Sequence, residues 1–183
     1  MIIGITGTIG AGKGTVVEYL KQRGFSHYSS SGILREILAE RRLSATRLNM
    51  SMLADELMKQ YEGGVLQVSH ERAQQAGDTN YILEAIHRES EAAYIRSIGG
   101  VMLGVDADIR TRFERSIRRG DGEKDDVTFE QFLENSKRED DGKGETGANI
   151  RAVLRDADAV ITNDGSPEEL YAQIDAVLVK IAI

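Results

Sequence analysis

The stretch Gly7-Thr8-Ile9-Gly10-Ala11-Gly12-Lys13-Gly14-Thr15 follows an apolar run at residues 1–6 and leads into a helix-like segment that begins at Val16. A strand, a glycine-rich loop and a helix in this order aim successive backbone N–H groups and a helix N-terminus at one anion. Glycines permit positive φ angles and let the backbone approach that anion closely. Lys13 adds a positive charge for the β and γ phosphates. We therefore interpret this stretch as a phosphate-binding loop for a polyphosphate.

The loop departs from the general pattern at its last hydroxyl. Many phosphate-binding loops have Ser or Thr directly after the lysine, where it holds Mg²⁺. Here Gly14 follows the lysine and the hydroxyl comes at Thr15. A Lys-Gly-Thr ending resembles the adenylate and cytidylate kinases, and this resemblance implies that the threonine touches phosphate while the magnesium sits among waters. We expect no direct metal ligand, with Thr15 and Glu84 acting on Mg²⁺ through water.

Composition favours one compact enzyme domain. The chain has 183 residues, of which 40% are hydrophobic, and a net charge of −7. An acidic body argues against non-specific binding to nucleic acid or to a membrane surface, so any anion site must be a local group of arginines. The absence of cysteine excludes disulfides and thiolate zinc sites. With no basic leader and no long apolar run, we expect a cytoplasmic protein without a membrane partner.

Short apolar runs alternate with longer segments of helical period along the chain. This alternation predicts an α/β protein with a parallel sheet between helices. The predicted strands are residues 2–6, 25–29, 81–86, 100–106 and 158–162. The predicted helices are residues 13–23, 31–42, 46–61, 65–76, 89–98, 109–119, 128–139 and 167–182. Capping sequences at Thr128 and Ser166 start the last two helices, and the polar, glycine-rich residues 120–126 and 140–149 predict surface loops.

Four later segments join the loop in a fixed order. His27-Tyr28-Ser29-Ser30-Ser31-Gly32-Ile33-Leu34-Arg35 places serines, a glycine and an arginine after a strand. Tyr81-Ile82-Leu83-Glu84-Ala85-Ile86-His87-Arg88 is a strand followed by an acid and an arginine. Residues 105–120 carry arginines four apart, and residues 157–166 read Ala-Asp-Ala-Val-Ile-Thr-Asn-Asp-Gly-Ser. Together the five segments resemble the P-loop nucleoside monophosphate kinases, and within them the dephospho-CoA kinase-like and deoxynucleotide monophosphate kinase-like proteins.

The resemblance implies a three-layer α/β/α P-loop NTP hydrolase fold. It implies a five-stranded parallel sheet with a helical insertion that binds the acceptor nucleotide, and a lid. We expect a single domain, residues 1–183. Its implied parts are a core of residues 1–29, 77–118 and 151–183, acceptor-binding helices at residues 30–76, and a lid region at residues 119–150.

The resemblance also implies a set of site residues. Residues expected to bind ATP are Gly7, Thr8, Gly10, Ala11, Gly12, Lys13, Gly14, Thr15, Asn163 and Gly165. Residues expected to bind the acceptor are Ser31, Arg35 and Arg88. Residues expected to act in catalysis are Lys13, Glu84, Arg88, Arg115 and Arg119. Four positions depart from the family pattern: Ile33 replaces an aspartate, Glu84 an aspartate, Ala85 a glycine and His87 a proline.

Arginine suits this chemistry for a physical reason. Phosphoryl transfer needs alignment and neutralised charge more than covalent help, and a guanidinium binds two phosphate oxygens while staying charged. Arg115 and Arg119 share a helix face by their spacing. The alternatives are an ordinary solvated face for the arginines at 110–119, and pairing of Arg35 with Glu36 or Glu40.

Other polar and apolar groups have structural interpretations. His27, His70 and His87 lack metal-ligand spacing, and no serine-nucleophile motif accompanies them, so we interpret them as structural. The apolar stripe from Met50 to Met58 is interpreted as core rather than base pocket.

The function expected from these residues is ATP-dependent phosphoryl transfer, with Mg²⁺, to a nucleoside or deoxynucleoside monophosphate. One alternative is dephospho-CoA kinase-like transfer to a ribose hydroxyl. True dephospho-CoA kinases carry acids near the position of residues 29–31, where this chain has three serines, and an acid there would activate the hydroxyl. The other alternative is a nucleotide-binding regulatory ATPase without an acceptor.

Overall fold

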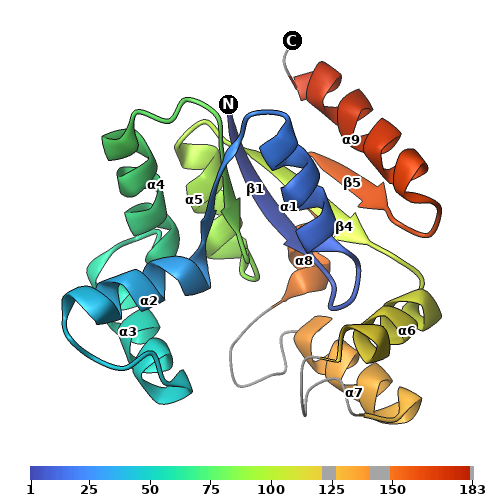
Figure 1. Cartoon of the computed structure of the whole chain (residues 1–183), viewed down its shortest axis with the longest axis horizontal. Coiled ribbons are helices and arrows are strands. Elements are labelled where there is room, and N and C mark those ends of the chain that lie inside the picture. The colour runs from blue at the N-terminus through green and yellow to red at the C-terminus, as the bar shows by residue number, and fades with distance from the viewer. Residues whose placement is uncertain (121–126, 141–148, 182–183) are drawn as a thin grey trace.

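The computed structural model describes residues 1–120, 127–140 and 149–181. In this part of the chain, five strands form one parallel sheet in the order β2-β3-β1-β4-β5 (Figure 1). The strands are β1 Ile2–Gly7, β2 Ser26–Ser29, β3 Tyr81–Glu84, β4 Val101–Asp106 and β5 Ala159–Thr162. The predicted five-stranded parallel sheet is therefore confirmed. Since parallel strands end at the same edge, Gly7, Glu84 and Asp106 meet there.

The helices follow the predicted order, with one addition. They are α1 Lys13–Gln22, α2 Ser30–Glu40, α3 Arg47–Gln60, α4 Val65–Ala76, α5 Glu89–Ser97, α6 Ile109–Arg119, α7 Phe129–Asp140, α8 Ile150–Arg155 and α9 Pro167–Ile181. The prediction missed α8, which has only 6 residues. Asn149 caps it by accepting a hydrogen bond from the N–H of Ala152, at 3.2 Å. This short helix exists because most of its residues are buried against the sheet.

Local capping sets several helix starts. The hydroxyl of Ser29 accepts a bond from the N–H of Gly32 at 3.0 Å, so α2 begins one residue earlier than predicted. Glu169 and Ser166 exchange backbone–side-chain bonds at the start of α9. Thr128 and Gln131 do the same before α7. The two predicted capping boxes are confirmed.

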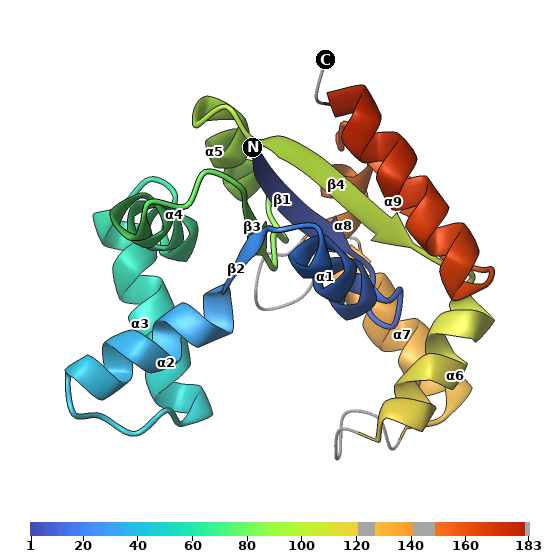
Figure 2. The ribbon, with the colours of Figure 1, turned by 45° about the horizontal axis from the view of Figure 1, so that its top comes forward.

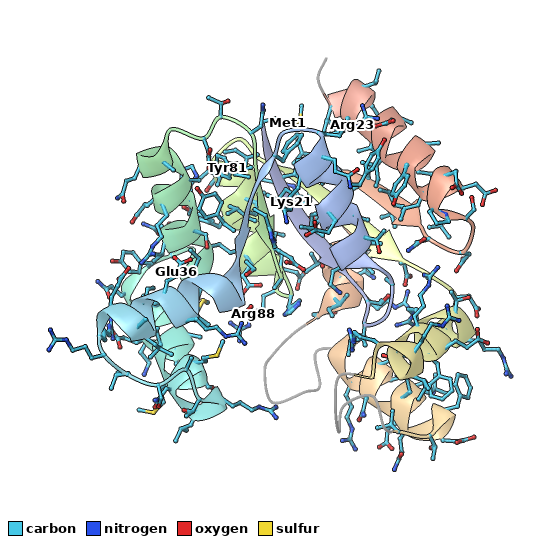
Figure 3. All side chains as sticks on the ribbon, in the orientation of Figure 1. Met1, Lys21, Arg23, Glu36, Tyr81 and Arg88 are labelled. Carbon is cyan, nitrogen blue, oxygen red and sulfur yellow. The ribbon has the colours of Figure 1, made fainter. Side chains whose placement is uncertain are left out.

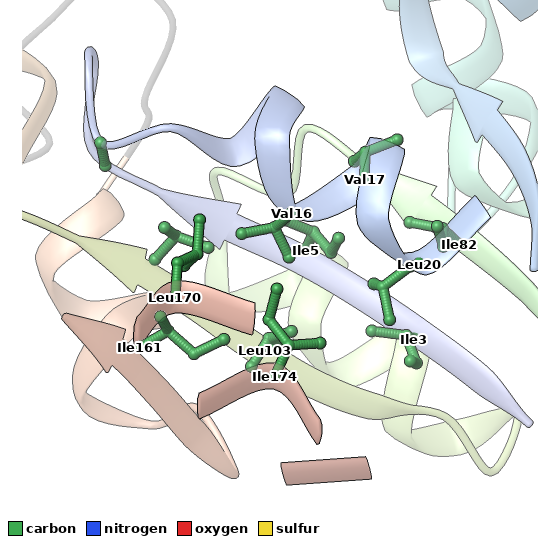
Figure 4. Packing of buried hydrophobic residues seen from close by; sticks show 12 residues of the cluster. Ile3, Ile5, Val16, Val17, Leu20, Ile82, Leu103, Ile161, Leu170 and Ile174 are labelled. Atoms are coloured by element: carbon green, nitrogen blue, oxygen red, sulfur yellow. The ribbon is translucent and has the colours of Figure 1, made fainter. Parts of the chain in front are cut away.

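Three apolar clusters hold the layers together. Figure 4 shows the first, where Val16 and Leu20 of α1 and Ile174 of α9 pack on Ile5 and Leu103 of the sheet. The second joins α4, α5 and α8 to the opposite face. Figure 2 shows α1 and α9 on one side of the strands and α5 and α8 on the other. The chain is thus a three-layer α/β/α protein, as expected.

The third cluster lies outside the sheet, within the helical insertion. Leu53 and Leu57 of α3 pack against Leu34 and Leu38 of α2. The interpretation of the Met50–Met58 stripe as core is wrong for Met52, which is 61% exposed. Leu53 and Leu57, four residues apart, lie on the buried side of α3, whereas Met52 lies on its solvent side.

The parts of the domain named from the sequence remain predictions. Residues 121–126 and 141–148 of the expected lid lie outside the described residues. Within the described helices, none is both long and apolar enough to cross a bilayer.

Candidate functional site

The phosphate-binding loop connects β1 to α1 and requires its glycines for two separate reasons. Gly10 and Gly12 have φ angles of +77° and +97°, where other residues are strained. A Cβ on Gly10 would lie 2.4 Å from the carbonyl oxygen of Arg112, and one on Gly12 would lie 2.3 Å from Nδ2 of Asn163. Backbone N–H groups of a loop this closely packed are preorganised to face an anion. The loop therefore fits a nucleoside triphosphate.

Lys13 lies over the loop that it terminates. Its Nζ donates hydrogen bonds to the carbonyl oxygens of Gly7, at 2.7 Å, and Thr8, at 3.0 Å. Both acceptors belong to the loop, so the ammonium group is already held beside the place that the phosphates would occupy. This position agrees with the role expected for Lys13.

Asn163 braces the loop from the end of β5. Its Nδ2 donates to the carbonyl oxygen of Ala11 at 2.8 Å, and the residue is only 6% exposed. Its own carbonyl accepts a bond from Nη1 of Arg115 at 2.7 Å. Asn163, expected beside the donor base, thus also positions the loop. Gly165 follows it in the β5–α9 connection, where a Cβ would meet the side chain of Glu169.

Glu84 lies at the end of β3 and is paired with a histidine. Its Oε2 is 2.8 Å from Nε2 of His27, and each side chain is 22% exposed. The hydrogen bond with His27 lowers the pKa of Glu84, against a smaller opposing effect of burial, and the positive charge of Lys13 lowers it further. Glu84 is therefore an ionised carboxylate next to the phosphate loop. His27, interpreted as structural, lies in the site.

A pocket of about 250 Å³ opens next to Glu84, between the helical insertion and the start of α5. Its apolar wall includes Leu34, Met58 and Leu66. The polar residues of the lining are Ser30, His87, Arg88 and Glu91. Figure 3 shows Arg88 beside the N-terminal end of α2. An apolar lining with a few polar groups is the usual form of a small-molecule site.

Backbone contacts fix the β3–α5 connection that lines this pocket. Glu91 Oε2 accepts bonds from the N–H groups of His87, at 2.7 Å, and Arg88, at 3.0 Å. Ala85 has a φ of +72°, which explains why the kinases that the segment resembles use glycine there. A strained residue at the mouth of a pocket is a common feature of functional sites.

The other two expected acceptor residues lie on α2. Ser31 is exposed, and its neighbour Ser30 lines the pocket, donating a bond to the carbonyl of Glu84 at 3.0 Å. Arg35 is exposed and has no ion pair among the described residues. Its suggested pairing with Glu36 or Glu40 is wrong, because both carboxylates bind Arg72 instead, at 2.6 and 2.9 Å. The Arg35 guanidinium is therefore available to a ligand.

Arg112 of α6 contradicts the alternative of an ordinary solvated face for the arginines at 110–119. It is 2% exposed. Its Nε donates to the carbonyl of Ala107 at 3.1 Å, and its Nη1 donates to Oγ of Ser136 at 3.0 Å. The same Nη1 is 3.5 Å from the carbonyl oxygen of Ile9 in the loop. Arg112 thus joins α6 and α7 to the loop, whereas Arg119 is exposed at the end of α6.

Asp106 is a site residue that the sequence analysis missed. It ends β4, and its Oδ1 accepts a bond from the hydroxyl of Thr8 at 2.7 Å. Its Oδ2 accepts one from Nη1 of Arg151, at the start of α8, at 3.1 Å. One signal could have identified Asp106: it ends β4, the strand that pairs with β1, and the phosphate-binding loop follows β1. Glu84 and Asp106 thus flank the loop on either side.

Metal ligation by protein groups alone finds no support in the described residues. They contain no group of three or more His, Cys, Asp or Glu side chains that could hold an ion. The action of Thr15 and Glu84 on magnesium through water stays a prediction.

Comparison with known proteins places the chain in a family. A family model described as an AAA domain, AAA_18, matches residues 3–142. The chain belongs to this family. It is 28% identical over 188 residues to a UPF0200 protein of Thermococcus kodakarensis, covering 99% of this chain and 98% of that protein. A UPF0200 protein of Methanocaldococcus jannaschii is 29% identical over 185 residues, covering 99% of this chain and 90% of that protein.

Solved structures share the fold of the family. TT1252 from Thermus thermophilus superposes with a TM-score of 0.62 and 23% identity, covering 98% of this chain and 97% of that one. Dephospho-CoA kinase from Campylobacter jejuni superposes with a TM-score of 0.57 and 16% identity, covering 98% of this chain and 96% of that one. Shikimate kinase from Aquifex aeolicus superposes with a TM-score of 0.56 and 16% identity, covering 100% of this chain and 98% of that one. The resemblance to P-loop kinases and the predicted fold are confirmed.

Proposed function

We propose that the protein transfers the γ-phosphoryl group of ATP to a nucleoside or deoxynucleoside monophosphate. The observation that carries this proposal is the pocket lined by Arg88, which adjoins the loop of Lys13 at the carboxyl ends of β1 and β3. A donor phosphate on the loop and an acceptor phosphate at Arg88 would both lie at this edge of the sheet. Alignment of this kind is most of what phosphoryl transfer requires.

The state of Glu84 supports a phosphate rather than a hydroxyl as acceptor. A hydroxyl acceptor needs a general base, and a good base has a pKa near the working pH. The His27 hydrogen bond instead lowers the pKa of Glu84 below its ordinary value. The hydroxyl of Ser29 already accepts a hydrogen bond from the N–H of Gly32, and the hydroxyl of Ser30 donates one to the carbonyl of Glu84. A phosphate acceptor attacks as an anion and needs no base, so it fits these residues better.

Each residue has a stated role in this proposal. The loop and Lys13 bind the β and γ phosphates, Arg35 and Arg88 hold the acceptor phosphate, and Arg115 and Arg119 face the transferring group. Magnesium, when bound, neutralises phosphate charge, and Glu84 orients its water. Residues 119–150 serve as a lid that excludes water, which would otherwise hydrolyse ATP.

Incubation with Mg-ATP and a panel of acceptors tests the proposal. The panel contains the ribonucleoside and deoxyribonucleoside monophosphates, dephospho-CoA and shikimate, and the products are separated by chromatography. We expect a nucleoside diphosphate from at least one monophosphate. Product from dephospho-CoA alone would favour the hydroxyl acceptor. ATP hydrolysis without any phosphorylated acceptor would favour the regulatory ATPase.

Arginine variants assign the two sides of the site. We expect Arg35→Ala and Arg88→Ala to raise the acceptor KM and lower kcat, with little change in ATP binding. Arg23→Ala is the matched control, because Arg23 is an exposed arginine at the opposite end of the sheet (Figure 3). A collapse of ATP affinity in either test variant would mean that its arginine serves the donor.

A further inference from the structure

His87 is one of the polar residues that line the proposed acceptor pocket. It lines the pocket together with Arg88 and Ser30. Its backbone is fixed from two sides: the N–H donates to Glu91 Oε2 at 2.7 Å, and the carbonyl accepts from the N–H of Asn149 at 2.8 Å. The residue therefore cannot leave the pocket without disturbing the starts of α5 and α8.

The imidazole ring itself has no partner in the described part of the chain. No hydrogen bond to either ring nitrogen joins His87 to another described residue. His27 and His70 differ, since their rings bond to Glu84 at 2.8 Å and to the hydroxyl of Tyr81 at 2.6 Å. A fixed, partly buried ring without a partner, in a pocket beside an arginine, is ready to bond to a ligand.

The charges around the ring define what kind of ligand it can accept. Lys13 of α1 and Arg88 of the β3–α5 connection are positive, and Glu84 of β3 is negative. Glu91 of α5 is occupied by the backbone N–H groups of His87 and Arg88. Burial, Lys13 and Arg88 lower the pKa of His87 to about 4, and Glu84 raises it less. Glu91 Oε1 also lies 3.9 Å from Nη1 of Arg88. The ring is therefore neutral at neutral pH, because burial and the two cations lower its pKa more than Glu84 raises it.

We propose that His87 binds the acceptor directly, its ring donating a hydrogen bond to an anionic oxygen of a phosphomonoester that Arg88 also holds. This deepens the proposed function and rests on it. The acceptor phosphate offsets the charges of Lys13 and Arg88, which with burial lower the pKa of the ring, so acceptor binding raises that pKa. The neutral ring donates one N–H to the phosphate, and below the raised pKa the protonated ring makes a charge-assisted bond, which is stronger than a neutral one. A neutral nucleoside gives no such effect.

Kinetics of His87 variants give the first test. His87→Leu removes the donor at similar volume, and we expect the acceptor KM to rise about tenfold or more, as for one lost bond to a charged group, with the ATP KM unchanged. His87→Gln retains an N–H donor and should recover part of the loss. His70→Gln is the matched control, because His70 is a half-buried histidine that does not line the pocket. An unchanged acceptor KM in His87→Leu would overturn the proposal.

A titration of the ring gives a second test that does not depend on variants folding. The full chain, labelled at its 3 histidines, is followed by NMR from acid to neutral pH, alone and with AMP, CMP, GMP or UMP, or the matching nucleosides. We expect the pKa of His87 to rise by about 1 to 3 pH units with the monophosphate that is turned over, and not with its nucleoside. The other two signals belong to His27 and His70, and the His87→Leu variant identifies the signal of His87 by its absence.

The two proposals fail in different ways. If a monophosphate is phosphorylated but leaves the titration of His87 unchanged, the His87 proposal is wrong and the kinase proposal stands. If no monophosphate is phosphorylated and none shifts the ring, both are wrong. If a monophosphate shifts the ring without turnover, His87 binds the phosphomonoester and the kinase proposal alone is wrong.

Discussion

Replacement of Asn163 by alanine tests the hydrogen bond that joins the end of β5 to the phosphate-binding loop. The amide Nδ2 donates to the carbonyl oxygen of Ala11 at 2.8 Å, and Ala11 is fully buried. Its removal leaves that carbonyl without this partner, which costs about 1 to 3 kcal/mol. For a chain of this size, each kcal/mol moves the melting temperature by about 2 to 4 °C. We therefore expect Asn163→Ala to lower Tm by roughly 2 to 12 °C.

The same variant should bind ATP more weakly, since the loop loses one of the contacts that fix its shape. Thermal unfolding with and without Mg-ATP measures both effects in one assay, because a ligand stabilises the folded state by mass action. Asn49→Ala is the matched control: its Nδ2 also donates to a carbonyl at 2.8 Å, that of Ser44, but near the surface. A Tm equal to that of Asn49→Ala, together with the same rise in Tm on adding Mg-ATP as in the unmodified protein, would refute the role given to the Asn163–Ala11 hydrogen bond.

Three further predictions concern single residues. Lys13→Ala should keep its circular dichroism spectrum and lose transfer to every acceptor by roughly 10² to 10³-fold, as for one lost charge-stabilising donor; normal turnover would contradict the kinase proposal. Ala85→Gly should raise the free energy of unfolding in urea by up to about 1 kcal/mol, because relief of a φ of +72° exceeds the added freedom of the unfolded chain; a loss of stability would show that no strain is present. The pKa of His87 is about 4 in the folded chain against an ordinary 6.5, so the unfolded chain binds the extra proton between these values. Stability should therefore be full above pH 6.5, fall as the pH drops from 6.5 to about 4, and level off below that, for a total loss on the order of 3 kcal/mol. His87→Leu should lack this decline, and equal declines in urea unfolding would contradict the assignment.

Local signals were enough to predict most of the fold. The glycine-rich loop, the capping residues and the apolar periods all act within a few residues of sequence, so strands and long helices could be read directly. Helix α8 could not be read this way. Six residues make too few turns to show a period, and burial against β1 and β4 defines this helix.

The site was predictable where it lies on sequence motifs. Lys13 and Glu84 were found because a loop and a strand end have recognisable patterns. Asp106 and Arg112 were missed because their roles come from partners far along the chain, Thr8 and Ile9. The pairing of Glu84 with His27 likewise depends on β2 lying beside β3, which the sequence does not specify.

The position of β1 in the middle of the sheet has a consequence for biosynthesis. β1 carries the phosphate loop, yet it pairs with β3 and β4 and not with β2, the next strand in the chain. A nascent chain that has reached only α4 contains the entire glycine-rich sequence but neither partner strand for β1. The loop also needs Thr8 bonded to Asp106 and Ala11 bonded to Asn163. If the proposed function is right, the loop therefore reaches its ATP-binding shape only after residue 163 has been made, and until then the growing chain folds without the support of a bound nucleotide.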